Sequence, residues 1–325
     1  MKTLQLEKYN IHVVTLPLPF DLDHVNCYVA VDRDGMWKLI DCGVNTEQNH
    51  AAWDKRISDL GLDWKRLQAI YVTHFHPDHY GAAGWLQEKS GAPVYMLPSG
   101  LEEVEILFNN RKHFLGELAD YYQRNGVPEP LTQEMMGTLS KTGSLIHSQA
   151  RLSPVEAGTR INLGGYEYEV IWTPGHAEGH CCFYGRENGI LFAGDQLLAH
   201  ISTNISLWPD GNPNPLAVYL ESLQQLRKLP INIVLPAHGQ SFTGAAERID
   251  ELCAHHRERL ELTKAAAGNG SSAYEVCREI FGDQLNVYDM RFALAETMAH
   301  LVYLEQNSKL ATRLDGDRLL FYQPA

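Results

Sequence analysis

Histidine and aspartate gather in one short segment of the chain. Residues 73–79 read Thr-His-Phe-His-Pro-Asp-His, which brings His74, His76, Asp78 and His79 close together. Imidazole and carboxylate are ligand types that suit zinc, iron or manganese. Burying three imidazoles and a carboxylate without a cation would be costly. The segment therefore predicts a metal site.

The spacing within this segment predicts two metal ions rather than one. His74 and His76 are two residues apart and can point to the same side of the chain. Pro77 and the short side chain of Asp78 favour a sharp turn. That turn carries Asp78 and His79 to a second position, about 3.5–4 Å away if the two sites have the usual spacing. One segment can thus supply two ligands to each of two ions.

Three more candidate ligands lie far along the chain, each in a turn after an apolar run. They are His176 in Thr-Pro-Gly-His, Asp195 in Phe-Ala-Gly-Asp and His238 in Leu-Pro-Ala-His-Gly. Loops at strand ends are common positions for catalytic groups. We expect His176 to complete the first site, His238 to complete the second and Asp195 to bridge both. His180 is expected to pack against or orient a ligand instead of binding metal.

Short apolar strands must position these turns. They are predicted at Ile11–Leu16, Asn26–Val31, Met36–Ile40, Leu67–Val72, Pro93–Leu97, Arg160–Leu163, Tyr166–Trp172, His180–Tyr184, Ile190–Ala193 and Ile231–Pro236. Residues 17–24, which contain proline and aspartate, join the first two strands. Helical patterns are predicted at Asn45–Gly61, Tyr80–Ser90 and Leu216–Leu229. Alternating strands and helices indicate an α/β fold.

Two regions depart from this pattern. Residues 99–150 show helical patterns and no strand, which predicts a helical insertion in a catalytic domain of residues 1–244. Residues 245–325 read as three helices, Ala245–Ala267, Ala273–Phe281 and Tyr288–Gln306, followed by a hairpin around Asp315-Gly316. Three helices and a two-stranded hairpin predict a small winged-helix-like domain.

Composition excludes several classes of protein. The 325 residues carry a formal charge of −13, which disfavours a general electrostatic attraction to nucleic acid or an anionic membrane. No apolar stretch approaches the roughly 20 residues that cross a bilayer, and no secretory signal is recognisable. The six cysteines are scattered, as in reduced proteins. These features predict a cytoplasmic location.

The order HxHxDH, TPGH, GD and PxHG resembles the metallo-β-lactamase superfamily over about residues 10–240. Asn26 and the segment Leu39–Gly43 resemble its N-terminal strands. The resemblance implies an αβ/βα sandwich of two mixed sheets with helices outside. It implies the same metal ligands as above: His74, His76 and His176 for one ion, Asp78, His79 and His238 for the other, and Asp195 between them.

The complete ligand set separates branches of that superfamily. True β-lactamases usually lack the bridging aspartate that Asp195 resembles. Flavin-linked diiron reductases have an HxExD motif and a flavodoxin domain, and neither feature is present in this sequence. Persulfide dioxygenases use one iron, for which His79 and His238 would be surplus ligands. Glyoxalase II-like thioesterases, lactonases, phosphodiesterases and ribonucleases remain.

Residues 245–325 resemble a winged-helix domain found in one hydrolase branch that includes a mitochondrial endoribonuclease. Acidic residues outnumber basic ones there, so we expect docking or homodimerisation rather than nucleic-acid binding.

We therefore expect a hydrolase that uses water activated by two divalent ions, zinc first with iron or manganese as alternatives. Asp78 and Asp195 would orient that water and accept its proton. The insertion is rich in apolar residues (Leu101, Ile106, Leu107, Phe108, Phe114, Leu115, Tyr121, Tyr122, Met135 and Met136), which belong either to its core or to a lid over the site.

A lid of that kind, with the loop Trp208–Pro213 as another wall or a plain turn, suits a small-molecule ester, thioester or lactone. The alternatives are a phosphodiesterase or endoribonuclease acting on single-stranded RNA, and a binding or regulatory protein with little turnover.

Overall fold

Two mixed β-sheets form the centre of the protein in the computed structural model, which describes residues 5–19, 22–142, 145, 150–268 and 270–324. The first sheet has the order β1 (Ile11–Pro17), β2 (His24–Val31), β3 (Trp37–Ile40), β4 (Leu67–Tyr71), β5 (Val94–Met96) and β6 (Leu152–Pro154). The second has the order β11 (Ile233–Pro236), β10 (Ile190–Gly194), β9 (Cys181–Gly185), β8 (Tyr166–Trp172) and β7 (Arg160–Leu163). Both sheets combine parallel and antiparallel pairs.

Apolar side chains join the inner faces of the two sheets. Tyr28 of β2 meets Phe192 of β10 edge-on, with ring centroids 5.2 Å apart, and Tyr71 of β4 meets Phe183 of β9 at 5.8 Å. These residues belong to one buried cluster that includes residues of both sheets. The strand β10 is buried along its whole length, as its unbroken apolar run predicts.

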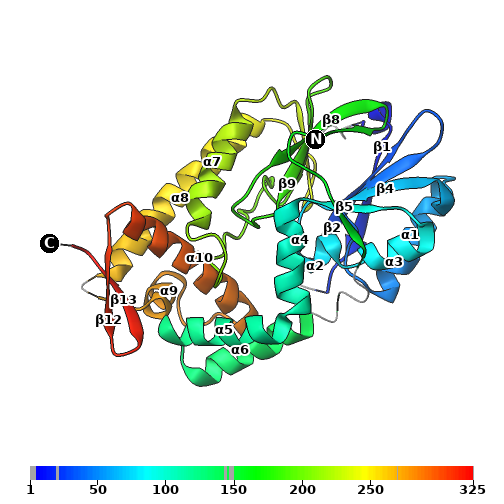
Figure 1. Ribbon diagram of the computed structural model, residues 1–325. Coiled ribbons are helices and arrows are strands. Elements are labelled where there is room, and N and C mark those ends of the chain that lie inside the picture. Colours follow the sequence, from blue (N-terminus) through cyan, green and yellow to red (C-terminus); the bar gives the residue numbers. More distant parts are fainter. Residues whose placement is uncertain (1–4, 20–21, 143–144, 146–149, 269, 325) are drawn as a thin grey trace.

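Helices cover the outer faces (Figure 1). α1 (Glu47–Asp59) and α3 (Ala83–Ser90) share a buried cluster with the first sheet. α7 (Pro215–Arg227) and α8 (Ala245–Ala267) share another with the second sheet. The arrangement is the αβ/βα sandwich expected from the sequence.

The region after β5 is helical, as predicted. It contains α4 (Pro98–Val104), the π-helical turn η3 (Glu105–Asn109), α5 (Arg111–Arg124) and α6 (Glu129–Thr142). The predicted insertion over 99–150 includes residues 143–144 and 146–149, and the predicted connection over 17–24 includes residues 20–21. These positions lie outside the described residues.

The three helices and the hairpin predicted near the C-terminus are present. They are α8, α9 (Ala273–Phe281), α10 (Val287–Gln306) and the strands β12 (Ala311–Asp315) and β13 (Arg318–Tyr322). Ser272 begins α9 with a capping box to Glu275. The hydrophobic cluster under these helices also contains residues of α5, α6 and α7, so the core is continuous across residue 244. The winged-helix assignment and the domain division stay predictions.

Short elements differ from the expectation. The predicted helix Tyr80–Ser90 is two helices, α2 (Pro77–Tyr80) and α3. The break lies at Gly81, where a Cβ atom would come within 3.0 Å of the Val44 Cα and 2.2 Å of the Pro77 carbonyl oxygen. Position 81 therefore has no room for a side chain. The strand β6 and the 3-10 turns η1 (Glu7–Tyr9) and η2 (Trp64–Arg66) were not predicted. Among the described residues, no helix combines the length and apolar character needed to cross a bilayer.

Candidate metal centre

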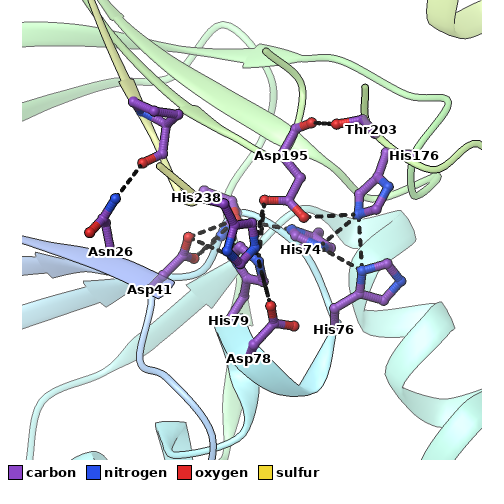
Figure 2. Close-up of polar contacts among 12 residues, drawn as sticks. Asn26, Asp41, His74, His76, Asp78, His79, His176, Asp195, Thr203 and His238 are labelled. Carbon is purple, nitrogen blue, oxygen red and sulfur yellow. Dashed lines mark hydrogen bonds and ion pairs between the residues drawn. The ribbon is translucent and has the colours of Figure 1, made fainter. Parts of the chain in front are cut away.

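All seven side chains singled out in the sequence meet at one end of the sandwich, in two adjoining groups (Figure 2). His74, His76, His176 and Asp195 form the first group, and within each group the potential ligand atoms lie within 4.8 Å of one another. The second group consists of Asp78, His79 and His238. The segment after β4, which includes α2, and the turns after β8, β10 and β11 carry these residues.

Three imidazole nitrogens converge in the first group. His74 Nε2 lies 2.9 Å from His76 Nδ1, and His176 Nε2 lies 3.2 Å and 3.0 Å from the same two atoms. Protons cannot satisfy all three contacts between neutral rings, because the His176 Nδ1–H already donates to the carbonyl of Asn204 and leaves Nε2 only an acceptor. Zinc–nitrogen bonds of about 2.0–2.1 Å in a tetrahedron would place such nitrogens about 3.3 Å apart. The three nitrogens fit a cation.

The second group leaves buried polar atoms without hydrogen bonds. His79 Nε2 and His238 Nε2 are both buried and unpartnered, although they lie 3.5 Å and 3.3 Å from Asp78 Oδ2. A buried polar atom without a partner is costly, and a shared cation would satisfy both nitrogens and the carboxylate.

Asp195 lies between the groups. Its Oδ2 is 3.4 Å from His176 Nε2 in the first group, and its Oδ1 is 3.5 Å from His79 Nε2 and 3.3 Å from His238 Nε2 in the second. Oδ1 is also buried without a hydrogen bond. One carboxylate therefore faces both positions, as expected for a bridging residue.

The electrostatics of the site favour positive ions. Burial lowers the pKa of His76 to about 3, helped by the neighbouring His176, so this ring offers a lone pair at neutral pH. Burial would also lower the pKa of His238, but the carboxylates of Asp195 and Asp78 outweigh it and raise that pKa to about 10. The second group thus lies in a negative potential that stabilises a cation.

Asp41 orients two of the histidines. Its Oδ2 accepts a hydrogen bond from His79 Nδ1 at 2.9 Å, and its Oδ1 accepts one from the backbone N–H of Thr73 at 2.8 Å. The Thr73 hydroxyl donates to Asp41 and accepts from His74 Nδ1 at 3.1 Å. Both rings therefore turn Nε2 towards the site. Sequence reasoning missed this role, although Asp41 follows the apolar strand β3 just as Asp195 follows β10.

The Asp41→Ala variant is expected to bind metal about 10- to 100-fold more weakly, because His79 loses the partner that fixes its tautomer and ring orientation. Competition with a chromogenic chelator measures this affinity. Asp120→Ala, at an exposed position on α5, is the matched control. Equal affinities for Asp41→Ala and wild type would contradict the orienting role.

Hydrogen bonds from distant segments hold the remaining rings. The His238 Nδ1–H donates to the carbonyl of His24 at 2.7 Å, and Asn26 Nδ2 donates to the Gly239 carbonyl at 2.8 Å, so β2 supports the His238 turn. The carbonyl of Asn204 accepts from His176, and the side chain of Asn204 donates to the carbonyl of Phe292 on α10 at 3.2 Å. The orientation of His176 is thus linked to α10.

His180 lies behind the two groups, in agreement with its expected role. Its Nε2 accepts the backbone N–H of Asp195 at 3.1 Å, and its Nδ1 lies 2.8 Å from the hydroxyl of Thr173. Both ring nitrogens are therefore occupied, and the ring positions Asp195.

A cavity of about 300 Å³ opens over both groups. The insertion supplies one wall, and Trp208, in the predicted loop, supplies another. The first turns of α10 supply a third, which the sequence did not predict. Mostly apolar residues line these walls: Leu107, Phe108, Phe114, Leu115, Leu139, Leu198, Ile201, Trp208, Tyr288 and Phe292. Other apolar residues of the insertion, such as Tyr122 and Met135, belong to the buried core. The insertion therefore combines both expected roles.

A third group of potential ligands, His256, Glu296 and His300, lies between α8 and α10. His256 Nδ1 donates to His300 Nε2 at 3.2 Å, and His300 Nδ1 donates to the carbonyl of Glu296 at 2.8 Å. Burial lowers the pKa of His256 to about 3 and that of His300 to about 4. Protons satisfy these two contacts, although His256 Nε2 is left buried without a hydrogen bond. Because no carboxylate oxygen of Glu296 is needed to explain the two contacts, we interpret the pair as part of the packing between the helices.

Glu296 makes stability depend on pH. Burial raises its pKa from 4.5 to about 7, against the opposing charge of Arg259. The folded protein therefore keeps this proton longer than the unfolded chain, and stability falls as the pH rises through that range. Glu296→Gln is expected to raise the free energy of unfolding by about 1–3 kcal/mol at pH 8 and much less at pH 5. Urea unfolding at both pH values measures the difference, and a gain independent of pH would contradict it.

Comparison with known proteins identifies the family of most of the chain. The family described as "Metallo-beta-lactamase superfamily" matches residues 20–238, and "Metallo-beta-lactamase-like, C-terminal domain" matches residues 260–325. The probable metallo-hydrolase YqjP of Bacillus subtilis (strain 168) is 25% identical over 329 residues, which cover 96% of this chain and 97% of YqjP. The atrochrysone carboxyl ACP thioesterase of Aspergillus fumigatus is 23% identical over 75% of this chain and 64% of its own length.

A solved structure shares the complete architecture. The crystal structure of the metallo-beta-lactamase family protein TTHA1429 from Thermus thermophilus superposes with a TM-score of 0.87 and 30% sequence identity, covering 97% of this chain and 99% of that one. The superposition thus includes both the sandwich and the C-terminal helices. Together with the family match over most of the chain, it shows that this protein is a metallo-hydrolase of the metallo-β-lactamase superfamily.

Proposed function

We propose that the protein hydrolyses a small-molecule ester, thioester or lactone with the help of two divalent metal ions. The observation that carries the proposal is the meeting of two ligand groups at the floor of an apolar cavity. His74, His76 and His176 would hold one ion, Asp78, His79 and His238 the other, and Asp195 both. Nitrogen and carboxylate ligands suit zinc, with iron and manganese as alternatives.

Two such ions, when bound, supply an activated water and a Lewis acid at neutral pH. The chain's own groups orient that water. Although burial alone would raise their pKa values, the histidines around Asp78 and Asp195 hold both carboxyls well below their usual range. Both carboxylates are therefore ionised at neutral pH and can accept a hydrogen bond from that water. The apolar walls exclude bulk water and so strengthen these interactions.

The cavity favours an acyl group over a polynucleotide. Its walls are mainly apolar, whereas single-stranded RNA binds in basic grooves with exposed aromatic platforms. The formal charge of −13 opposes binding of a polyanion. Hydrolysis of an acyl thioester by the Aspergillus relative, as its name states, supports the same choice. Phosphodiester hydrolysis remains the alternative, and a cytoplasmic location and a homodimer remain predictions.

Metal analysis and a substrate panel test the proposal. Purified protein is expected to contain close to two equivalents of zinc, iron or manganese. It should hydrolyse acyl thioesters, lactones or 4-nitrophenyl esters faster than bis-4-nitrophenyl phosphate or RNA. Removal of the metal by a chelator should abolish turnover, and added metal should restore it. Rapid phosphodiester cleavage without acyl hydrolysis would contradict the proposed substrate class.

A further inference from the structure

An arginine from the C-terminal region reaches the cavity over the metal centre. Arg291 lies in the second turn of α10 and lines the same cavity as His76, Asp78 and His238. Arg291 is only 7% exposed. The cavity therefore has an end with metal ligands and a wall with a buried cation.

This cation has no carboxylate partner among the residues that the structure describes. Its Nε is buried without a hydrogen bond. Two aromatic rings lie close to it: the guanidinium carbon is 4.2 Å from the ring centroid of Phe292 and 5.5 Å from that of Tyr288. Burial lowers the pKa of Arg291, yet a guanidinium keeps its proton in proteins. Burying such a charge without an anion is costly, so the position points to an anion that binds there.

A second guanidinium lines the same cavity. The Nη1 of Arg111, on α5, donates to the carbonyl of Leu107 at 3.3 Å, and its Nη2 donates to the carbonyl of Leu139. Among the described residues, neither arginine is paired with an acid, and the aspartates that line the cavity, Asp78 and Asp195, belong to the metal groups. If metal ions neutralise the two aspartates, the guanidinium groups of Arg111 and Arg291 remain as unneutralised positive charges on the cavity wall.

We propose that Arg291 binds an anionic group of the substrate, most simply a carboxylate at the far end of the acyl chain. This inference rests on the proposed acyl hydrolysis and narrows its substrate class to esters or thioesters of dicarboxylic acids. A guanidinium presents a planar fork of donors that matches a carboxylate, and the aromatic rings on Arg291 keep that fork in place. The scissile carbonyl would lie at the metals while the second carboxylate lies at α10.

Ligand binding tests the inference without depending on turnover. Glutarate and pentanoate have the same chain length and differ by one terminal carboxylate. Titration calorimetry of the metal-loaded protein with each acid therefore measures how much that carboxylate contributes to affinity. Wild type is expected to bind glutarate roughly 10- to 100-fold more tightly than pentanoate, the value of a charge-assisted hydrogen bond. Arg291→Gln should bring the ratio close to one, and Arg291→Lys should restore part of it.

Two controls distinguish recognition from a structural role. Arg227→Gln removes an exposed arginine of α7 that is paired with Asp250, and it should leave the glutarate preference unchanged. Arg291→Gln without ligand should melt no lower than wild type, because it removes an uncompensated charge, and glutarate should raise the melting temperature of wild type alone. Equal binding of the two acids by wild type, or a parallel loss of both in Arg291→Gln, would overturn the inference.

Kinetics locate the anion and separate this inference from the proposed function. 4-Nitrophenyl hydrogen glutarate should have a lower KM than 4-nitrophenyl pentanoate in wild type only. Pentanoyl coenzyme A and pentanoyl N-acetylcysteamine differ in the phosphates of the leaving group, so their comparison tests whether Arg291 binds phosphate instead. A preference for the coenzyme A thioester that is lost in Arg291→Gln would place the anion on the leaving group and overturn the acyl carboxylate. Turnover of all esters without any charge preference would overturn the inference and leave the hydrolase function intact. Dependence of glutarate binding on Arg291 without any acyl turnover would reject the function alone.

Discussion

Asp195→Ala is expected to lose nearly all hydrolytic activity and to retain less metal than the wild-type protein. The Asp195 carboxylate faces both ligand groups, with one oxygen 3.4 Å from His176 and the other 3.3 Å from His238. Its removal withdraws one ligand from each ion and one hydrogen-bond acceptor from the water. A fall in kcat of about 10³-fold or more is expected, equivalent to about 4 kcal/mol in the activation barrier.

Metal content and activity should fall together in this variant. Elemental analysis after dialysis, combined with ester hydrolysis at saturating substrate, measures both. The Asp120→Ala variant, at an exposed position of α5, controls for the loss of one negative charge. Full metal occupancy and unchanged turnover in Asp195→Ala would remove the bridge from the proposed centre.

Gly175→Ala is expected to damage both stability and metal binding. Gly175 has a φ of 130°, in the region that favours glycine, and it directly precedes His176. A Cβ atom there would lie 2.6 Å from the Cα of Tyr219 and 2.9 Å from its backbone nitrogen, so helix α7 would have to move. Backbone strain and overpacking together should cost about 3 kcal/mol or more. Displacement of the turn would also shift His176 away from His74 and His76.

The opposite result is expected at another glycine. Gly116 lies in α5, and apart from the backbone of its own helix no atom of the described residues lies within 4 Å of the position of an added Cβ. Gly116→Ala should therefore stabilise the protein by about 0.5–1 kcal/mol through its higher helix propensity. Urea unfolding of the two variants with added metal makes the comparison. Equal unfolding midpoints for Gly175→Ala and wild type would show that the turn tolerates a side chain.

The metal groups were predictable because their members lie in short motifs. His74, His76, Asp78 and His79 are neighbours in sequence, so their spacing alone indicated a shared site. Asp41 was harder to assign, since its partner His79 is 38 positions away and only the pairing of β3 with β4 brings them together. The alternation of apolar strands and helices predicted only the α/β class, and the sandwich was implied by the resemblance to the superfamily.

Arg291 had no local signal at all. It occurs in a helix of ordinary pattern, and its chemistry depends on tertiary packing that places α10 beside the insertion and the metal centre. The need for glycine at position 81 likewise depends on a close approach to Val44, which no sequence pattern records. Propensity and spacing predicted the elements, and non-local contacts decided how they shape the cavity.

The hydrogen bonds of Asn204 restrict how this protein can be divided or recombined. A gene fragment ending at residue 244 would encode all seven candidate ligands but would lack Phe292, whose carbonyl holds the Asn204 side chain. The same fragment would expose the core shared by α7 and α10. A chimera that exchanges C-terminal regions between relatives must therefore transfer the Asn204 loop together with α10, since His176 depends on both.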